Sequence, residues 1–195
     1  MDLAIKNIAS SSPVLEIGSF CGLSTNVISY LLLTHGKANK IFTCDKWIFE
    51  GSENALYLGK SHIKHQEYRE YIKSAFMRNV QFFSHENVPY AIEGFSDEFF
   101  DLWEKNATTS DVFKRTVTMG GGISFCYVDG NHTYEYAKRD FINTDKYLEK
   151  GGYILFDDSS DNNVFGLTRL IMEISKNKHY EVVIKNPNYL FRKIT

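Results

Sequence analysis

The sequence has no long apolar segment and no cluster of basic residues. No window approaches the roughly 20 uninterrupted apolar residues that a membrane-spanning helix requires. Lysines gather only in short runs at 37–40 and 176–178, and the formal net charge of the 195-residue chain is −2. A domain that binds nucleic acid usually carries a basic patch or stripe. We therefore expect neither a membrane nor a nucleic acid as a partner.

Cysteine is also scarce. Cys21, Cys44 and Cys126 are the only three, and no two of them form a CxxC pair. An odd number without paired spacing argues against a disulfide framework and against a structural zinc site. Residues 1–12 lack the basic segment followed by an apolar stretch that marks a secretory signal. These features predict buried free thiols and a cytoplasmic protein.

Apolar side chains are plentiful, at 43% of the residues, which is enough for a single domain spanning 1–195. Short apolar runs alternate with segments of helical spacing. Strands are expected at 14–17, 40–45, 89–94, 125–129, 152–157, 180–184 and 189–194, and helices at 23–33, 68–76, 97–103, 133–149 and 165–175. This order predicts an α/β fold, with a mostly parallel seven-stranded sheet, helices on both faces and a C-terminal antiparallel hairpin. The polar or glycine-rich stretches 46–64 and 106–122 are interpreted as insertions.

A glycine turn follows the first expected strand. Segment 14–25, VLEIGSFCGLST, runs from a buried strand through Gly18 and Gly22 into a helix. Glycine lets the backbone approach a ligand closely, and open α/β sheets bind ligands at the carboxyl ends of their strands. The spacing is ExGxxxG rather than GxGxxG, which disfavours a nicotinamide dehydrogenase. Glu16 and Asp45, at the ends of two strands, suit a cationic ligand with a ribose, because a carboxylate can accept hydrogen bonds from both ribose hydroxyls.

Three aspartates end two later strands. Asp129 closes the strand at 125–129, and Asp157 and Asp158 close the strand at 152–157. Carboxylates held close together repel one another unless a proton or a metal neutralises them, and oxygen ligands suit Mg²⁺. The three residues are therefore candidate metal ligands. The alternative is that Asp158 caps a turn with the two serines that follow it.

His132 lies three residues after Asp129, at the start of an expected helix. A histidine can act as a general base near neutral pH. It can equally be a neutral side chain that forms a hydrogen bond at the helix start, next to Thr133.

These motifs together resemble those of class I S-adenosylmethionine-dependent methyltransferases. Segment 14–25 is similar to the first motif of the catechol O-methyltransferase-like enzymes, and Glu93–Asp97 resembles their loop against the adenine. Segments 127–135 (YVDGNHTYE), 151–158 (GGYILFDD) and 165–169 (FGLTR) resemble a group with a DGxHxYE signature, which includes macrocin-type sugar O-methyltransferases. The resemblance extends from about Pro13 to the C-terminal hairpin and rests on the order and spacing of several motifs.

The resemblance implies a Rossmann-like methyltransferase fold with S-adenosylmethionine as the methyl donor. The residues that it implies for donor binding are Glu16, Gly18, Ser19, Phe20, Gly22, Ser24, Asp45, Lys46, Trp47, Ser96, Asp97 and Asp129. Ser24 has a plain helix cap as its alternative role. Trp47 would cover the adenine, although a tryptophan after a strand also suits core packing.

The resemblance also implies Mg²⁺ at Asp129, Asp157 and Asp158, although the catechol enzymes have Asp-Asn where this chain has Asp-Asp. At the offset of His132 the catechol enzymes carry the lysine that removes the hydroxyl proton. His132 is therefore the candidate general base, with Asp129 as the second catalytic residue.

The function expected from the sequence is metal-assisted O-methylation of a small hydroxylated substrate, either a sugar or a phenol-like molecule. Two alternatives stay open: metal-independent N- or C-methylation on the same fold, and a catalytically inactive subunit that binds S-adenosylmethionine. The N-terminal stretch lacks the extra helices that often cover the site in this fold. Either the insertions or a second subunit would then complete the site, which favours a homodimer.

Overall fold

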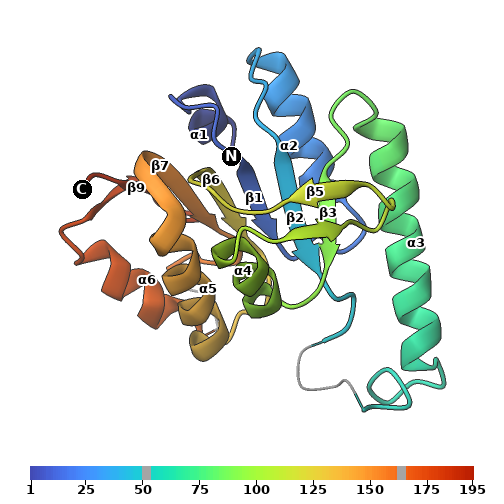
Figure 1. The fold of residues 1–195 in the computed structure, drawn as a ribbon. Helices are drawn as coiled ribbons and strands as arrows, with labels where there is room; N and C mark the ends of the chain where they lie inside the picture. The colour runs from blue at the N-terminus through green and yellow to red at the C-terminus, as the bar shows by residue number, and fades with distance from the viewer. Residues whose placement is uncertain (50–53, 162–165) are drawn as a thin grey trace.

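The computed structural model describes residues 1–49, 54–161 and 166–195, which form one seven-stranded sheet covered by helices (Figure 1). The strand order is β3-β2-β1-β6-β7-β9-β8. Neighbouring strands from β3 to β7 are parallel, whereas β9 is antiparallel to both β7 and β8. The strands are β1 (Val14–Ile17), β2 (Ile41–Asp45), β3 (Tyr90–Glu93), β6 (Ile123–Val128), β7 (Leu148–Phe156), β8 (Tyr180–Ile184) and β9 (Leu190–Lys193). The predicted fold and its C-terminal hairpin are confirmed.

Helices cover both faces of the sheet. On one face lie α4 (Ser96–Glu104), α5 (Tyr134–Tyr147) and α6 (Leu167–Ser175), and on the other lie α1 (Asp2–Lys6), α2 (Leu23–Thr34) and α3 (His65–Phe83). Strand β1 is buried along its whole length. Its Leu15 and Ile17 join the core beneath α4, α5 and α6, whereas Val14 packs with residues of α1 and α2. This two-sided burial explains why the strand is an unbroken apolar run except for Glu16.

Several boundaries differ from those expected. The helix expected at 133–149 ends at Tyr147, and β7 starts at once with an irregular register opposite Ile123 to Phe125. Gly151, at φ +85°, lies within this part of β7, which is why only its regular second half was predicted as a strand. Helix α3 is longer than the expected 68–76. The start of the last expected helix, at 165, lies outside the described residues.

The stretch 106–122 contains a small antiparallel ribbon of β4 (Thr108–Ser110) and β5 (Thr116–Thr118). Its strands are short and mostly polar, so they carry no apolar alternation that a sequence could reveal. An ion pair between the buried Asp111 and the partly exposed Arg115 closes its turn at 2.5 Å. The Arg115 guanidinium lies 4.5 Å from the ring centre of Tyr90, which fastens the ribbon beside β3.

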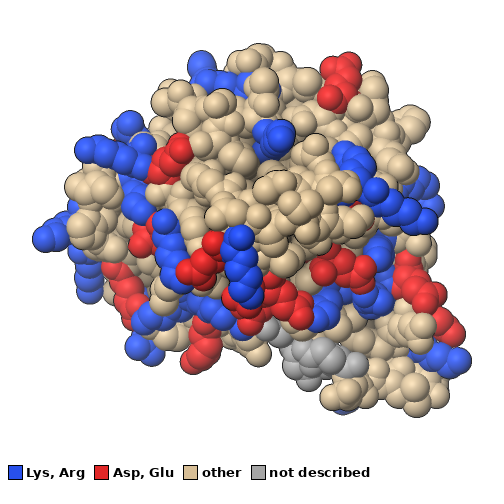
Figure 2. Space-filling view, in the orientation of Figure 1, with Lys and Arg blue, Asp and Glu red and all other residues tan. Residues whose placement is uncertain are grey.

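Charged side chains of both signs are interspersed on the face drawn in Figure 2, most densely along its lower edge. The arrowheads of β1 and β2 point toward the same edge in Figure 1.

No helix in the described ranges is long and apolar enough to cross a membrane.

Candidate functional site

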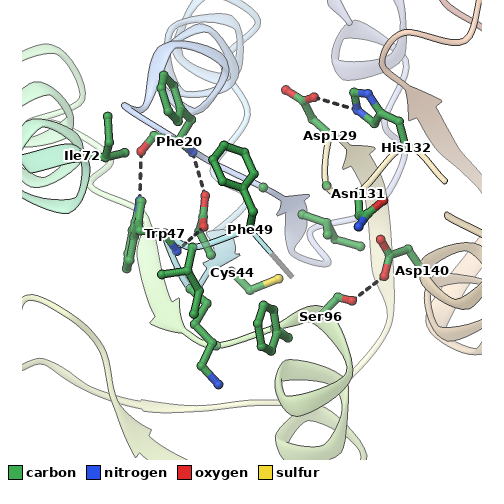
Figure 3. Close-up of a pocket in the computed structure, with 18 of the residues that line it drawn as sticks. Phe20, Cys44, Trp47, Phe49, Ile72, Ser96, Asp129, Asn131, His132 and Asp140 are labelled. Carbon is green, nitrogen blue, oxygen red and sulfur yellow. Dashed lines mark hydrogen bonds and ion pairs between the residues drawn. The ribbon is translucent and has the colours of Figure 1, made fainter. Parts of the chain in front are cut away.

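A cavity of about 630 Å³ opens at the carboxyl ends of β1, β2, β3 and β6 (Figure 3). Its volume falls within the ~300–1,000 Å³ typical of small-molecule sites, and its position is where open α/β sheets bind ligands. The predicted site residues that line it are Gly18, Phe20, Asp45, Lys46, Trp47, Ser96, Asp129 and His132. The other predicted residues lie around it, outside its lining: Glu16, Ser19, Gly22, Ser24, Asp97, Asp157 and Asp158.

The glycine turn brings the end of β1 against the end of β6. Gly18 has φ +82°, and its amide donates a hydrogen bond to the Cys44 carbonyl at 3.0 Å. A side chain at Gly18 would overlap the carbonyl oxygen of Asp129. Gly22 also has positive φ, at +86°, and a Cβ there would lie 3.0 Å from Val80 of α3. The two glycines therefore permit both the turn and the close packing on either side of it.

Replacement of Gly18 by alanine is expected to destabilise the protein about 1–3 kcal/mol more than replacement of Gly36, the difference being the cost of overpacking. Both glycines have positive φ, +82° and +62°, so both variants carry similar backbone strain. Only Gly18 has a neighbour in the way, because nothing lies within 4 Å of a Cβ at Gly36. Urea unfolding of the two variants measures the difference. Equal destabilisation would mean that the turn can move away from Asp129.

Asp45 ties this turn to β2. One carboxylate oxygen accepts hydrogen bonds from the amides of Ser19 and Phe20 at 2.9 and 2.8 Å, and the other accepts one from the Trp47 amide at 2.6 Å. The Trp47 indole donates to the Phe20 carbonyl at 2.9 Å, and its ring packs against Phe76. Trp47 is only 4% exposed, so it serves core packing as well as lining the cavity.

Glu16 lies beneath the turn and is fully buried. The Thr25 hydroxyl donates to its Oε2 at 2.5 Å, whereas its Oε1 has no hydrogen-bond partner among the described residues. Burial raises the pKa of the Glu16 carboxyl to about 7, against the effect of nearby hydroxyls of Ser24, Thr25 and Thr43. Ser24 lies near Glu16 and does not line the cavity.

At the other end of the cavity His132 is held between two carboxylates. Its Nε2 lies 3.3 Å from Oδ1 of Asp129, and its Nδ1 lies 3.4 Å from Oδ2 of Asp158 (Figure 3 shows the first pair). The Asp129 carboxylate beside Nε2 raises the pKa of His132 against the effect of burial, and the charges of Asp158 and Asp157 raise it further. Burial raises the pKa of Asp129, and repulsion from Asp157 adds to that rise.

Asp157 and Asp158 are oriented by the C-terminal hairpin and the loop after β7. Asn188 donates to Asp157 Oδ1 at 2.6 Å. Asp158 has a positive φ, at +47°. The hydroxyl of the next residue, Ser159, donates a hydrogen bond to the Phe156 carbonyl and accepts one from the Tyr189 amide. In the described part of the chain no three His, Cys, Asp or Glu side chains are placed to hold a metal. The magnesium site therefore stays a prediction.

The side of the cavity next to β3 is built by the start of α4. Lys46 pairs with Glu98 at 3.0 Å, and its ammonium lies 4.4 Å from the ring centre of Phe95. The Ser96 hydroxyl donates to Asp140 of α5. Asp97 does not line the cavity, and its carboxylate pairs with Arg139 at 3.5 Å.

Sequence reasoning missed several cavity residues, namely Phe49, Tyr68, Ile72, Asn131 and Asp140. Phe49 and Tyr68 stack with ring centres 6.5 Å apart, but Phe49 lies in a stretch that has no periodic pattern. Asp140 did leave a signal. It lies between Ala137 and Thr144 at helical spacing, so it places a carboxylate on the buried side of α5.

The chain matches the model of a protein family described as a methyltransferase domain over residues 15–159. This range includes the glycine turn, Asp45, the Asp129–His132 pair and both aspartates after β7. The chain therefore belongs to the methyltransferase domain family, with the fold of the class I S-adenosylmethionine-dependent enzymes.

Three similar proteins illustrate the likeness. Uncharacterized protein R132 of Acanthamoeba polyphaga mimivirus is 31% identical over 86 residues, which are 40% of this chain and 39% of that protein. The chain thus matches about two fifths of that relative's length. The O-methyltransferase NovP has a TM-score of 0.63 at 13% identity, over 100% of this chain and 78% of NovP. CalS11, a calicheamicin methyltransferase, has a TM-score of 0.63 at 16% identity, over 98% and 75% of the two chains. The two structures share the fold with this chain.

Proposed function

We propose that this protein transfers the methyl group of S-adenosylmethionine to a hydroxyl oxygen of a small molecule, with His132 as the general base. The observation that carries the proposal is the position of His132, at the wall of the cavity and between the carboxylates of Asp129 and Asp158. NovP is described as an O-methyltransferase and CalS11 as a TDP-rhamnose 3′-O-methyltransferase. A sugar or phenol-like hydroxyl is therefore the proposed acceptor.

In this proposal the chain's residues divide the work between binding and proton transfer. The turn at Gly18 leaves room for the donor beside β1, and Asp45 keeps the turn in place. Asp129 orients the imidazole of His132 through Nε2. The acceptor's hydroxyl would take the place of the Asp158 carboxylate at Nδ1, and this nitrogen accepts its proton as the oxygen attacks the methyl carbon. The carbon–sulfur bond breaks in the same step, and the sulfonium leaves as a neutral thioether. Alignment of the two substrates supplies much of the rate.

Mg²⁺ held by Asp129, Asp157 and Asp158 is the finer part of the proposal. Carboxylate oxygens at two adjacent strand ends suit the chemistry of this ion. Among the described residues, however, no three such side chains are grouped so as to hold it. Burial, and then repulsion from Asp157, raises the pKa of Asp129. A bound divalent ion would lower the pKa of an acceptor hydroxyl. His132 faces both Asp129 and Asp158. A metal bound by these two carboxylates would therefore compete with His132 for them.

The experiment that tests the function follows labelled methyl transfer from S-adenosylmethionine to a panel of phenols, catechols and nucleotide sugars, with EDTA or with Mg²⁺. We expect methylation of an oxygen on at least one acceptor, a loss of at least about tenfold with EDTA, and recovery with Mg²⁺. Unchanged activity in EDTA would exclude a role for the metal in the reaction, while the proposal of O-methylation would stand. Transfer only to amines or carbon would contradict O-methylation.

The homodimer expected from the sequence stays a separate proposal, which light scattering of the purified protein tests.

A further inference from the structure

Helix α3 has a long outer face that the other described elements leave exposed. The helix forms one edge of the molecule in Figure 1. Its Ile72, Phe76 and Val80 are buried in the core beside Trp47. On the opposite side, at spacings of three or four residues, lies a row of exposed side chains, here called the outer face of α3: Glu67, Glu70, Tyr71, Ser74, Arg78 and Phe82.

The charges of the outer face are separated along the helix. Glu67 and Glu70 lie toward its N-terminal end, and Arg78 lies toward its C-terminal end. Glu70 accepts a hydrogen bond from Gln66 at 3.0 Å, but among the described residues neither Glu70 nor Arg78 forms an ion pair. The face therefore presents an unpaired acid and an unpaired base to whatever covers it.

The positions of these charges make the outer face complementary to itself. Glu70 and Arg78 each lie four residues from Ser74, on either side of it. In a two-fold interface the same patch of both copies meets, so each contact between two different residues occurs twice. A second α3 that runs antiparallel and crosses at Ser74 brings Arg78 of each copy opposite Glu70 of the other. The small side chain of Ser74 at the crossing lets the two helices approach closely.

The same arrangement places an aromatic ring opposite a hollow. Tyr71 is 67% exposed on the outer face. Tyr71 and Met77 each lie three residues from Ser74, so the two-fold axis brings Tyr71 of one copy to the level of Met77 of the other. A hollow at this level is lined by Ser74, Met77, Arg78, Gln81 and Phe82. Aromatic side chains that fill a pocket at the centre of an interface commonly supply much of its binding energy.

Apolar side chains extend the match to the ends of the helix. Phe82, 73% exposed, lies at the C-terminal end. Leu56 and Ile63 are exposed at the N-terminal end, where the His65 amide donates a hydrogen bond to the Leu56 carbonyl at 3.0 Å. Antiparallel packing brings Phe82 of each copy toward this apolar end of the other. Burial of apolar surface would then stabilise both ends of the interface.

We propose that two copies of this chain associate through the outer faces of α3, antiparallel and related by a two-fold axis at Ser74. The inference assigns a surface to the homodimer and does not depend on the proposed methyltransferase activity. Tyr68 and Ile72, on another side of α3, line the cavity. The second copy therefore supports a helix of the cavity wall and leaves the cavity itself open.

Charge reversal of the full-length protein tests this pairing. Sedimentation equilibrium at protein concentrations on the order of 1–100 μM gives the dimer dissociation constant. We expect the wild-type mass to rise toward twice that of the chain. Glu70→Arg and Arg78→Glu each place like charges opposite one another twice in the dimer, so each should raise the dissociation constant at least about tenfold.

Mixing the two variants should restore a dimer, because a Glu70→Arg chain and an Arg78→Glu chain present opposite charges to each other at both sites. This recovery also shows that both variants are folded. The matched controls are Glu104→Arg and Lys150→Glu, which reverse exposed charges on α4 and β7. Both should dimerise like the wild type.

Three results would overturn the inference. A monomeric wild type at the highest concentration would leave the outer face to a different partner. A dimer that is unaffected by either reversal would use another surface, such as the exposed side of α2 with Leu23 and Tyr30. Variants that stay monomeric when mixed would contradict the pairing of Glu70 with Arg78. Failure of the protein to bind S-adenosylmethionine would contradict the proposed function alone.

Discussion

Replacement of His132 by alanine is expected to lower kcat for the best acceptor by about 10²–10⁴-fold, the range typical for loss of a general base. The reason is positional. His132 is the imidazole at the cavity wall, and carboxylates at 3.3 and 3.4 Å orient both of its nitrogens. The dissociation constant of S-adenosylhomocysteine should change less than threefold, because the adenine and the turn at Gly18 lie elsewhere in the proposed complex. Steady-state kinetics and calorimetry measure the two effects separately.

Two further variants control for this result. His85→Ala removes an exposed histidine outside the cavity and should leave kcat unchanged. His132→Lys supplies the base that the catechol enzymes carry at this offset, and it should recover part of the activity that alanine loses. A His132→Ala protein with kcat within threefold of the wild type would exclude His132 as the base.

Replacement of Glu16 by glutamine is expected to stabilise the protein by about 3 kcal/mol at pH 8 and to have little effect near pH 4.5. The pKa of Glu16 is raised from 4.5 to about 7 in the folded protein. Between these values the folded protein holds a proton that the unfolded chain releases, so the free energy of unfolding of the wild type falls as pH rises. Above pH 7 this loss is complete, and each pKa unit corresponds to about 1.4 kcal/mol. Glutamine cannot ionise and avoids the loss.

Urea unfolding of wild type and Glu16→Gln at pH 4.5, 6 and 8 gives the difference in free energy at each pH, which cancels the contribution of all other titrating groups. Glu181→Gln is the matched control, because this carboxylate lies on the surface of β8 near Arg192, at 3.4 Å. It should show no comparable trend. A Glu16→Gln protein whose stability runs parallel to that of the wild type across this range would show that Glu16 stays ionised when buried.

The sheet and the glycine turn were predictable because their signals are local. Val14 to Ile17 is apolar apart from Glu16 and is followed by a glycine, and Leu23 to Thr34 has helical spacing. The boundary between α5 and β7 was harder to predict, because Leu148 follows the helix directly and Gly151 interrupts the strand. The ribbon of β4 and β5 escaped because its stability comes from Asp111, Arg115 and Tyr90 rather than from apolar alternation.

The residues of the candidate site were predictable only where they belong to a sequence motif. Gly18, Asp45, Asp129 and His132 lie in segments with recognisable spacing, and the structure brings them to one cavity. Their partners could not be read from the sequence. Asp45 bonds to amides 25 and 26 residues away, and Asn188 reaches Asp157 across 31 residues. Such contacts depend on how strands are ordered in the sheet.

The central claim is that the cavity between Gly18, Asp45 and Asp129 binds S-adenosylmethionine. Calorimetric titration of the wild-type protein with S-adenosylmethionine and S-adenosylhomocysteine, with and without Mg²⁺, tests it most directly. We predict saturable binding of both compounds with one site per chain and micromolar dissociation constants. These correspond to binding free energies on the order of −8 kcal/mol. Absence of binding for both compounds under either condition would contradict the account.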